Sequence, residues 1–523
     1  MNSLCELLTK QLVAAAVLSE GHYPYDMPVC LVLREQFNAA ARVMLSIEAR
    51  LVAEWASDET LFDRGFGIYA LYNKGTEFLL VKCLAPAKDP TFPSISKKFV
   101  SAYRFERQMS SRMGVIPVGH PDPRPWIKHE DWPEDAWPLR KDFAPDTKMP
   151  RVKGEYRWIR AEGEGVYEIP VGPVHAGIIE PGHFRFQAVG EEVINLEERL
   201  GYVHKGIEKR FETLSWEQGV RLAGRVSGDT TVAHAIGYCR ALETMTGSMP
   251  PERGQWLRAI MLERERIANH MGDVAAICND VAFAFLFFQL NILKERLVRT
   301  NYRLLGHRFM MDRVIPGGVT TDLSPAAKDE MLSGLELFEK EFERLVVIYD
   351  ENSSLEDRLR ETGVLTPAQA RDLGMVGIVG RASGQSLDSR IQAPYPPYDR
   401  LQPRMHVLNS GDVHARAWVR IEEIRDSVRL LREFLANIPS GEICTPVTVP
   451  GPDCCGLSLV EGWRGEIVYW LQSGPRGEVN RCMVRDPSSL NWLGLEQAIH
   501  GNIVPDFPVC NKSFNQSYSG NDL

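Results

Sequence analysis

The sequence contains no run of about 18 uncharged apolar residues, the length that a transmembrane helix requires. Its longest apolar segment, Val281–Leu290, is too short to cross a bilayer, and we expect it to form a buried helix. The N-terminal segment combines an apolar stretch with acidic residues and lacks a site typical of signal-peptide cleavage. We therefore predict neither a membrane span nor a signal peptide, so any association with a membrane is expected to depend on partner proteins.

The ten cysteines include no C-x-x-C pair, the spacing that is common in metal and redox sites. Cys454 and Cys455 are adjacent, which is poor spacing for two ligands of one tetrahedral metal ion. The five cysteines of the first 280 residues are predicted to be small buried hydrophobic side chains in a reducing compartment: Cys5, Cys30, Cys83, Cys239 and Cys278.

The chain also lacks the features of two common binding classes. Its formal net charge of -9 gives no reason to expect a nucleic-acid partner. No glycine-rich phosphate loop follows a predicted strand, so the chain shows no NAD site of its own. What remains is a globular composition, with 44% hydrophobic and 25% charged residues.

A length of 523 residues is too great for one compact core, and we predict two domains. Residues 1–145 are expected to form a small α/β domain, residues 146–154 a linker, and residues 155–523 a large, mainly helical domain with small antiparallel sheets. The overall fold class is therefore α+β.

Within the first domain we predict a long helix over Leu31–Trp55 and a second helix over Ser94–Met113. Between them, two alternating segments within Phe66–Leu84 flank Asn73-Lys74-Gly75, which indicates a hairpin. The segment Gly114–Phe143 has six prolines and three tryptophans. Because proline disfavours regular structure and tryptophan anchors interfaces, this segment is expected to be an extended arm lying on another surface.

The second domain is organised around Val171–Glu208, where a Gly- and Pro-rich loop precedes a half-buried hairpin beginning at His183. Such a loop can hold polar side chains at a fixed place beside a rigid strand. His204 follows the hairpin. It could be a ligand or a proton carrier, but a hydrogen-bonded histidine that fixes its loop is the favoured interpretation.

Helical periodicity continues through the rest of the chain. Trp256–Val274 is periodic and charged on one face, and Ser324-Pro325 and Thr366-Pro367 are typical helix starts. A helix from Val413 to Asn437 carries interleaved Arg and Glu, which usually indicates a solvated face. Val460–Glu466 is expected to begin a second hairpin, in which Ile467–Leu471 lies opposite Arg481–Arg485.

A series of short motifs occurs in a recognisable order along the chain: Gly119–Asp122, Pro138–Phe143, Gly201–Lys209, Pro316–Val319, Gly380–Gly384, Asp388–Arg390 and Arg464–Glu466. Each is weak alone, but their shared order is specific. Together they resemble the large subunit of group 4, formate-hydrogenlyase-type, energy-converting membrane-bound NiFe hydrogenases. That part is fused to a domain similar to the small complex I subunit that precedes the hydrogenase-like one. The chain is also similar to the hydrogenase-like subunit of respiratory complex I itself, the NADH-quinone oxidoreductase.

The resemblance implies where a nickel-iron centre would be held, and the cysteine ligands are absent there. The two C-x-x-C pairs of the hydrogenases align with Ser227 and Thr230 and with Ser517 and Gly520. Because nickel in such a site needs soft, anionic sulfur ligands, we predict that this chain binds no metal and evolves no hydrogen. Cys510 is out of register.

The complex I comparison implies a quinone site whose residues are also changed. The family tyrosine that contacts the quinone head group aligns with Gly228. The family histidine position falls near Glu180-Pro181, and His183 is an alternative that the alignment does not assign.

Four polar residues remain as candidates for chemistry: Glu180, His183, Asp229 and Arg464. Glu180 aligns closest to the glutamate that relays protons in hydrogenases, and a carboxylate in a dry cleft would have a raised pKa. The structural alternatives are that Glu180 caps or salt-bridges a loop and that Asp229 caps a helix before Thr230-Thr231. Arg464 could bind an anionic group, pair with Glu180 or Asp229, or form an ion pair at a sheet edge.

The resemblance implies an oxidoreductase subunit of a respiratory or energy-converting complex. Electrons would come from an iron-sulfur cluster in a partner like the iron-sulfur small subunit of complex I, and a quinone-like acceptor would receive them with coupled proton movement. Other implied partners are a membrane subunit like that of complex I and antiporter-like membrane proteins, which place the chain peripherally on the cytoplasmic side of the inner membrane. The alternatives are a non-catalytic scaffold and, against the missing cysteines, a NiFe hydrogenase.

Overall fold

The computed structural model describes the chain except for residues 1, 13–14, 19–22, 129–131 and 177–178. It is 43% helical and 17% strand, with several small sheets, and is compatible with the predicted α+β class. Among the residues described, no helix combines the length and the apolar character needed to cross a membrane.

The N-terminal part of the chain folds around a five-stranded sheet of order β1-β2-β5-β4-β3. Its helices and strands are α1 (Ser3–Gln11), β1 (Ala16–Leu18), β2 (Val29–Leu31), α2 (Phe37–Ser46), β3 (Arg50–Asp58), β4 (Phe66–Lys74), β5 (Glu77–Ala85), β6 (Thr91–Pro93), α3 (Ala102–Met113) and β7 (Ile116–Val118). We call this unit the N-terminal domain. The predicted hairpin is confirmed as β4 and β5, which pair in antiparallel register from Phe66–Ala85 to Lys74–Glu77.

Two predicted helices of this domain have the wrong bounds. The segment expected to be helical over Leu31–Trp55 forms α2 and then β3, because Glu48 takes a left-handed conformation and the following residues pair with β4. This strand is buried on both faces and shows no alternation, and it contains alanine and leucine, which also favour helices. Helix α3 begins only at Ala102, since Ser94–Ser101 is bonded into turns, with Ser94 and Ile95 bonded to Glu106.

The proline-rich arm lies on the second domain, as predicted. Trp126 and Ile127 are buried in a cluster with Phe184 and Phe186 of the second domain. Arg124 donates a hydrogen bond to Glu197 at 2.5 Å. Beyond β7 at its start, the described part of the arm is therefore held by buried aromatic side chains and ion pairs.

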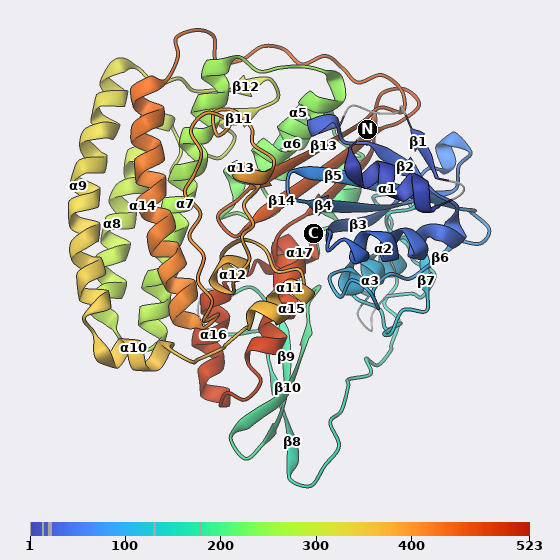
Figure 1. The fold of residues 1–523 in the computed structure, drawn as a ribbon, viewed down its shortest axis with the longest axis horizontal. Coiled ribbons are helices and arrows are strands. Elements are labelled where there is room, and N and C mark those ends of the chain that lie inside the picture. Colours follow the sequence, from blue (N-terminus) through green and yellow to red (C-terminus); the bar gives the residue numbers. More distant parts are fainter. Residues whose placement is uncertain (1, 13–14, 19–22, 129–131, 177–178) are drawn as a thin grey trace.

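The second domain begins with a three-stranded sheet that projects from the body of the molecule (Figure 1). This sheet contains β8 (Val166–Val171), β9 (His183–Val189) and β10 (Glu192–Arg199). The predicted hairpin is confirmed as β9 and β10, whose turn contains Gly190 at a positive φ of 61°.

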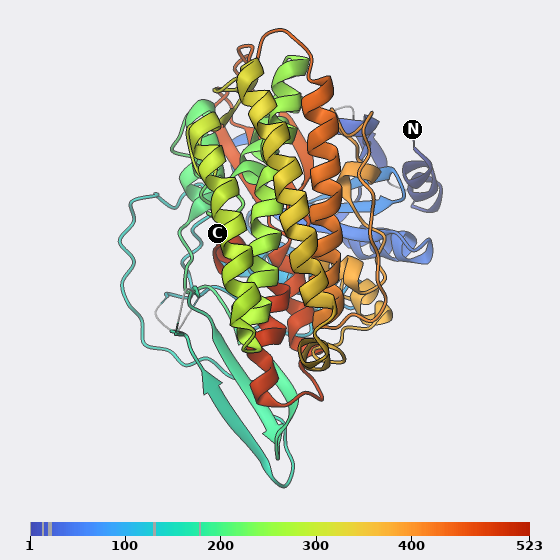
Figure 2. The same cartoon turned by 90° about the vertical axis from the view of Figure 1, so that its left-hand side faces the viewer.

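Four long helices form a bundle at one side, and they lie side by side in Figures 1 and 2. They are α7 (Glu252–Asp280), α8 (Ala284–Leu305), α9 (Pro325–Asp350) and α14 (Val413–Asn437). The shorter elements are α4 (Ile207–Phe211), α5 (Trp216–Ala223), α6 (Thr231–Thr246), β11 (Val314–Ile315), β12 (Gly318–Val319), α10 (Ser353–Leu359), α11 (Pro367–Asp372), α12 (Gly377–Ala382), α13 (Ser389–Gln392), α15 (Ser488–Ala498), α16 (Phe507–Phe514) and α17 (Tyr518–Asp522). The helix starts predicted at Ser324 and Thr366 are confirmed as capped N-termini.

The central sheet of the second domain has the order β13-β14-β15 and packs against α6. Its strands are β13 (Cys455–Glu461), β14 (Glu466–Ser473) and β15 (Val479–Arg485). The second predicted hairpin is confirmed as β14 and β15, in which Trp470 pairs with Met483 and Leu471 with Cys482. Strands β13 and β14 are joined by the turn that contains Arg464. This turn and the loop before α6 position the candidate site.

Two expectations about exposure are wrong. Arg416, Arg420 and Glu423 of α14 are buried, because they bond to residues of neighbouring elements such as α7 and α12 instead of facing solvent. Conversely, Phe285 and Phe288 of the apolar segment Val281–Leu290 are 50% and 60% exposed. The five cysteines predicted to be buried are all buried.

Candidate functional site

The two segments that align with the lost cysteine pairs meet in space. Ser227 lies in the loop between α5 and α6, Thr230 is the N-cap residue of α6, and Ser517 is the N-cap residue of α17. The hydroxyl oxygens of Ser227 and Ser517 are 2.8 Å apart. Gly520 donates its backbone N–H to the Ser517 hydroxyl at 2.9 Å. The four positions predicted from the sequence therefore surround one site.

The centre of this site is an ion pair between Asp229 and Arg464. The guanidinium donates to both carboxylate oxygens, with N–O distances of 2.8 and 2.6 Å. Ser227 and Thr230 also donate to the carboxylate, at 2.7 and 2.9 Å. Burial alone would raise the pKa of Asp229, but the charge of Arg464 and these hydrogen bonds outweigh it and hold the pKa below its usual range. Asp229 is thus a fixed anion, not the raised-pKa carboxylate that a dry cleft suggested.

Arg464 is held rigidly at the turn between β13 and β14. Its guanidinium lies 3.9 Å from the ring centre of Trp463, and its Nε donates to the carbonyl of Asn515 at 2.6 Å. The Trp463 indole N–H donates to the Thr230 hydroxyl at 3.0 Å. Only 4% of the Arg464 side chain is exposed, whereas 41% of the Asp229 side chain is exposed towards the cleft.

These contacts decide between the structural alternatives for the two residues. Asp229 does not cap α6, since Thr230 occupies the N-cap position and the Asp229 carboxylate is bonded to Arg464. Arg464 pairs with Asp229, not with Glu180. Its fork geometry matches the carboxylate in the bidentate manner that lysine could not reproduce.

The fourth ligand position leaves no room for a side chain. A Cβ atom added to Gly520 would lie 2.6 Å from the carboxyl carbon of Asp486. Asp486 is itself fixed, because it is bonded to His234 Nε2 at 3.0 Å and accepts the Ser488 N–H at 2.8 Å. His234 is bonded to the Tyr469 hydroxyl through its other ring nitrogen, also at 3.0 Å.

The residues present do not fit a nickel-iron centre. Hydroxyls, a carboxylate and a glycine stand where soft thiolates would be needed. Cys510 lies in α16 against Arg416 and Gly363, and burial raises the pKa of its thiol to about 11. Within the described part of the chain, no three His, Cys, Asp or Glu side chains are arranged to hold a metal ion.

A cavity of about 280 Å³, which we call the cleft, opens beside the ion pair. It is lined by Ile179, Glu180, Ser227, Gly228, Asp229, Arg464, Asn511, Lys512, Asn515, Gln516, Ser517, Tyr518 and Ser519. A Cβ atom on Gly228 would meet nothing within 4 Å, so the position of the family tyrosine is open space. The lining is rich in hydrogen-bond donors.

Glu180 and His183 lie in different surroundings. Glu180 is exposed at the cleft, where its carboxylate accepts the Ser519 N–H at 3.1 Å. Residues 177–178 of the same loop lie outside the described residues. His183 does not line the cleft; its ring centre is 4.8 Å from that of Trp158, and burial lowers its pKa. The structure therefore brings Glu180, Asp229 and Arg464 to one cleft and leaves His183 outside it.

The loop Gly201–Lys209 joins the two halves of the site. His204 Nδ1 donates to the carbonyl of Asp522 at 2.7 Å, and burial lowers the pKa of this histidine to about 4. Lys205 Nζ donates to the carbonyls of Arg225 and Val226 at 3.1 and 3.2 Å. The favoured interpretation of His204 as a hydrogen-bonded residue that fixes its loop is confirmed.

Two buried acids beside the cleft were missed from the sequence. Glu265 of α7 accepts the backbone N–H groups of Val232 and Ala233 at the start of α6, and burial raises its pKa to about 8. Its signal was the unusual density of charge in Leu262–Arg266, where four charged residues follow one another. Asp486 carried the weaker signal of an Asp-Pro pair directly after a strand.

Comparisons with known proteins place this chain in a family. Residues 28–149 match the family described as "Respiratory-chain NADH dehydrogenase, 30 Kd subunit", and residues 280–454 match the corresponding 49 Kd family. Formate hydrogenlyase subunit 5 of Escherichia coli is 31% identical over 479 residues, which cover 90% of this chain and 84% of the relative. The chain belongs to the formate hydrogenlyase subunit 5 family.

Other proteins similar to this chain carry related names. Hydrogenase-4 component G of Escherichia coli is 31% identical over 476 residues, covering 90% of this chain and 83% of the relative. The C/D subunit of the NADH-quinone oxidoreductase of Bacteroides thetaiotaomicron is 29% identical over 437 residues, covering 78% of this chain and 82% of the relative. The resemblance predicted from the motifs, to both hydrogenase and complex I proteins, is confirmed.

Proposed function

We propose that this chain is the large subunit of a membrane-associated redox complex of the respiratory or energy-converting kind, in which an ion pair occupies the place of the metal centre. The observation that carries the proposal is the bidentate Asp229–Arg464 pair, surrounded by the hydroxyls at the lost ligand positions. A buried cation beside a fixed anion gives the site a permanent charge arrangement without a metal.

In the proposed reaction, electrons come from an iron-sulfur cluster of a partner protein and pass to a quinone-like acceptor in the cleft. The cleft suits the head group of such an acceptor in size. The Ser519 hydroxyl and the Lys512 ammonium group line it and can donate hydrogen bonds to a carbonyl oxygen. Gly228 provides space where the complex I family has its tyrosine.

Reduction of a quinone consumes two electrons and two protons, so the cleft needs a route for protons. Because Asp229 is held ionised, we assign proton entry to Glu180, whose carboxylate lies at the cleft and is exposed to solvent. Glu265, with its pKa near 8, is a second group that can exchange a proton near neutral pH. His183 lies outside the cleft and receives no step.

The proposed partners are an iron-sulfur protein like the small iron-sulfur subunit of complex I, a membrane subunit like that of complex I, and antiporter-like membrane proteins. The chain would then sit peripherally on the cytoplasmic side of the inner membrane. The names of the relatives, which include formate hydrogenlyase and NADH-quinone oxidoreductase, support partners of this kind.

A scaffold without chemistry is the second candidate. It is favoured by one observation: the polar groups around Asp229 and Arg464 are already bonded to one another, as in a site whose function is structural. Such a protein would only hold the iron-sulfur partner against the membrane part.

Substitution of Glu180 by Gln in the purified complex separates the two candidates. The amide keeps an oxygen that can accept the Ser519 N–H but cannot carry a proton, so a relay should lose turnover at least tenfold. Glu191→Gln, at the exposed turn between β9 and β10, is the matched control and should leave turnover unchanged. Full activity in Glu180→Gln would reject Glu180 as the relay and favour the scaffold.

A further inference from the structure

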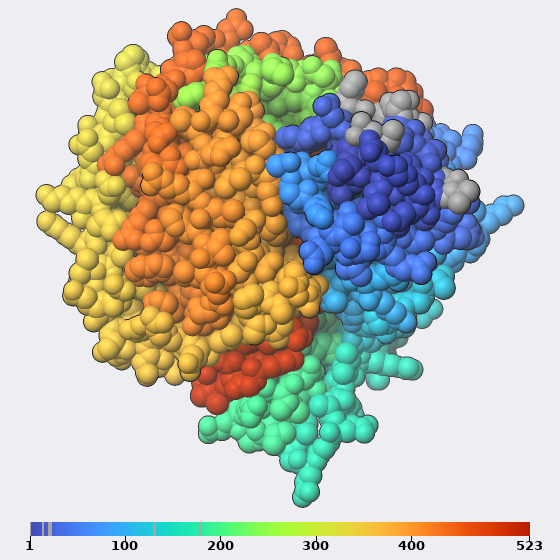
Figure 3. All heavy atoms as spheres, in the orientation of Figure 1, coloured from blue at the N-terminus to red at the C-terminus, as the bar shows by residue number. Residues whose placement is uncertain are grey.

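The N-terminal domain is joined to the second domain by buried polar contacts, and the two share one continuous surface in Figure 3. Arg50 of β3 pairs with Glu466, and the Ser57 hydroxyl donates to Gln472 at 2.9 Å. Two arginines of α3 cross the same boundary: Arg104 pairs with Glu198 at 2.9 Å, and Arg112 pairs with Glu208 at 2.9 Å. Buried ion pairs of this kind fix the orientation of the two domains, because a charged side chain that lost its partner would be left buried without water to solvate it.

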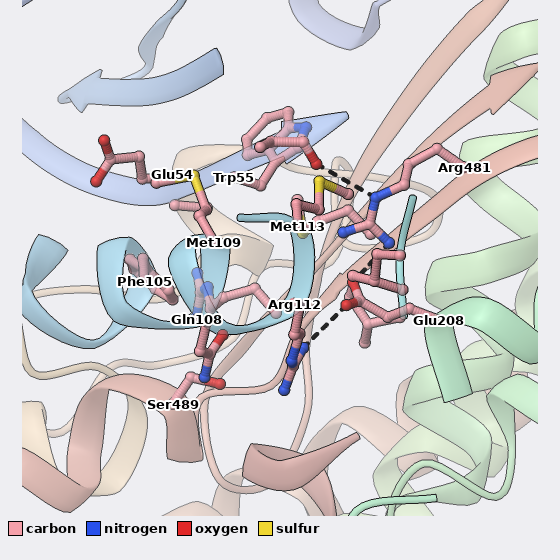
Figure 4. A pocket seen from close by; sticks show the side chains of 16 residues that line it. Glu54, Trp55, Phe105, Gln108, Met109, Arg112, Met113, Glu208, Arg481 and Ser489 are labelled. Atoms are coloured by element: carbon pink, nitrogen blue, oxygen red, sulfur yellow. Dashed lines mark hydrogen bonds and ion pairs between the residues drawn. The ribbon is translucent and has the colours of Figure 1, made fainter. Parts of the chain in front are cut away.

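Arg112 differs from the other crossing residues in what its second nitrogen contacts. Nη1 donates to Glu208, whereas Nη2 donates to the backbone carbonyl of Asp522 at 2.9 Å. Figure 4 shows Arg112 reaching from α3 towards Glu208, which is bonded on its other side to Arg481. Glu208 thus pairs with one arginine from each domain, and Arg112 directs its other nitrogen at the carbonyl.

The residue that Arg112 holds ends the short helix whose first residues line the cleft. Asp522 is the last residue of α17, the short helix that begins after Ser517 and contains Ser519 and Gly520. Its carbonyl also accepts from His204, and its carboxylate accepts the Val203 N–H at 3.1 Å. A helix of five residues has little stability of its own, so its position depends on these anchors.

We infer that Arg112, a residue of the N-terminal domain, is a positioning residue of the cleft that holds α17, and with it Ser517 and Ser519, in place. The N-terminal domain thereby contributes to a site formed otherwise by the second domain. The inference rests on the proposed function only in treating the cleft as the functional site. Its structural part, that Arg112 anchors residues 517–523, does not depend on which ligand binds in the cleft.

The geometry explains why arginine is needed at this position. One guanidinium bonds a carboxylate and a carbonyl that lie in different directions, which a single ammonium group does not match. Arg112 is 4% exposed and Glu208 is likewise 4% exposed, so water does not replace either contact easily. Without the guanidinium group, the hydrogen bond to the Asp522 carbonyl should be lost. A lysine at this position can still supply the positive charge opposite Glu208.

Hydrogen exchange measured by mass spectrometry on the full chain tests the anchoring. In Arg112→Gln and in the milder Arg112→Lys, we expect the amides of residues 517–523 to exchange at least tenfold faster than in the wild type. Arg104→Gln is the matched control: Arg104 lies on the same helix, is also buried and crosses the same boundary, but its contacts are Glu198 and Glu496. This variant should leave exchange of 517–523 unchanged.

Arg112→Lys keeps the test valid if Arg112→Gln fails to fold, because lysine preserves the charge next to Glu208. Unchanged exchange of residues 517–523 in folded Arg112→Lys would overturn the inference, as would equal acceleration in Arg104→Gln. In the active complex, Arg112→Lys should raise KM for the acceptor at least threefold with a smaller change in kcat, and Arg104→Gln should not. Faster exchange of residues 517–523 without a change in KM would show that Arg112 anchors α17 but that the acceptor does not bind in this cleft.

Discussion

The Asp229–Arg464 pair should make a measurable contribution to stability, and Asp229→Asn is the direct perturbation. Breaking a fully buried pair costs about 3–5 kcal/mol, whereas an exposed pair contributes about 0–1 kcal/mol. Here the Arg464 side chain is 4% exposed and that of Asp229 is 41% exposed, so the pair lies between these limits. Since Arg464 would keep its bonds to Asn515 and Thr230, we expect a loss of about 2 kcal/mol.

Urea unfolding of the purified chain, followed by circular dichroism and tryptophan fluorescence, measures this loss. A double-mutant cycle with Arg464→Met should return a coupling free energy of about 1–2 kcal/mol. Glu341→Gln, which breaks the exposed pair between Arg296 and Glu341, is the control and should change stability by less than about 0.5 kcal/mol. If Asp229→Asn is as harmless as this control, the ion pair does not occupy the site.

Three further changes have expected outcomes. The pKa of Glu265 is raised from 4.5 to about 8, so the protonated acid is the form favoured by folding, and stability should fall as pH rises between these values, by at most about 1.4 kcal/mol per pH unit. The difference in unfolding free energy between Glu265→Gln and the wild type, measured from pH 5 to pH 8, should follow this slope; a difference independent of pH would contradict the burial of a proton there. Gly520→Cys should destabilise the chain by about 1–3 kcal/mol, because its Cβ would meet the Asp486 carboxylate, and Asp486→Ala should partly relieve this loss in the double variant; additive losses in urea unfolding would refute the clash. Gly228→Ala should leave the free energy of unfolding within about 0.5 kcal/mol of the wild type, since its Cβ meets open space, and a large loss would mean that the cleft is closed at this point.

The sequence was sufficient to identify the three predicted hairpins and the capped helices, because each has a local signal. The β4–β5 hairpin has alternating strands around Asn73-Lys74-Gly75, and α9 and α11 have a capping residue followed by proline. Such signals depend on residues that are close together in the chain. The ordered motifs likewise sufficed to recognise the family.

Strand β3 and the buried charges could not be predicted, because their reasons are not local. Arg50–Asp58 is buried on both faces and so lacks an alternating pattern, and its strand character follows only from the pairing with β4. The arginines and acids of α14 have the spacing of a solvated face, and only the opposing charges of α7, such as Asp273 against Arg420, explain their burial. Composition along one helix does not reveal what the facing helix carries.

For the site, the family motifs predicted that Ser227, Thr230, Ser517 and Gly520 occupy one place, and the structure brings them together. The partner of Arg464 was left open among several possibilities, because nothing in one sequence pairs residues that are more than 200 positions apart. The role of Arg112 was invisible for the same reason.

Nickel and iron content of the complex purified from its native host tests the central claim most directly. The account predicts no nickel, and iron only in the amounts that iron-sulfur clusters of the partner proteins explain. Hydroxyls and an ion pair at the ligand positions do not supply the thiolates that nickel requires. One nickel per chain would contradict the account and place this protein among the hydrogenases that hold the metal.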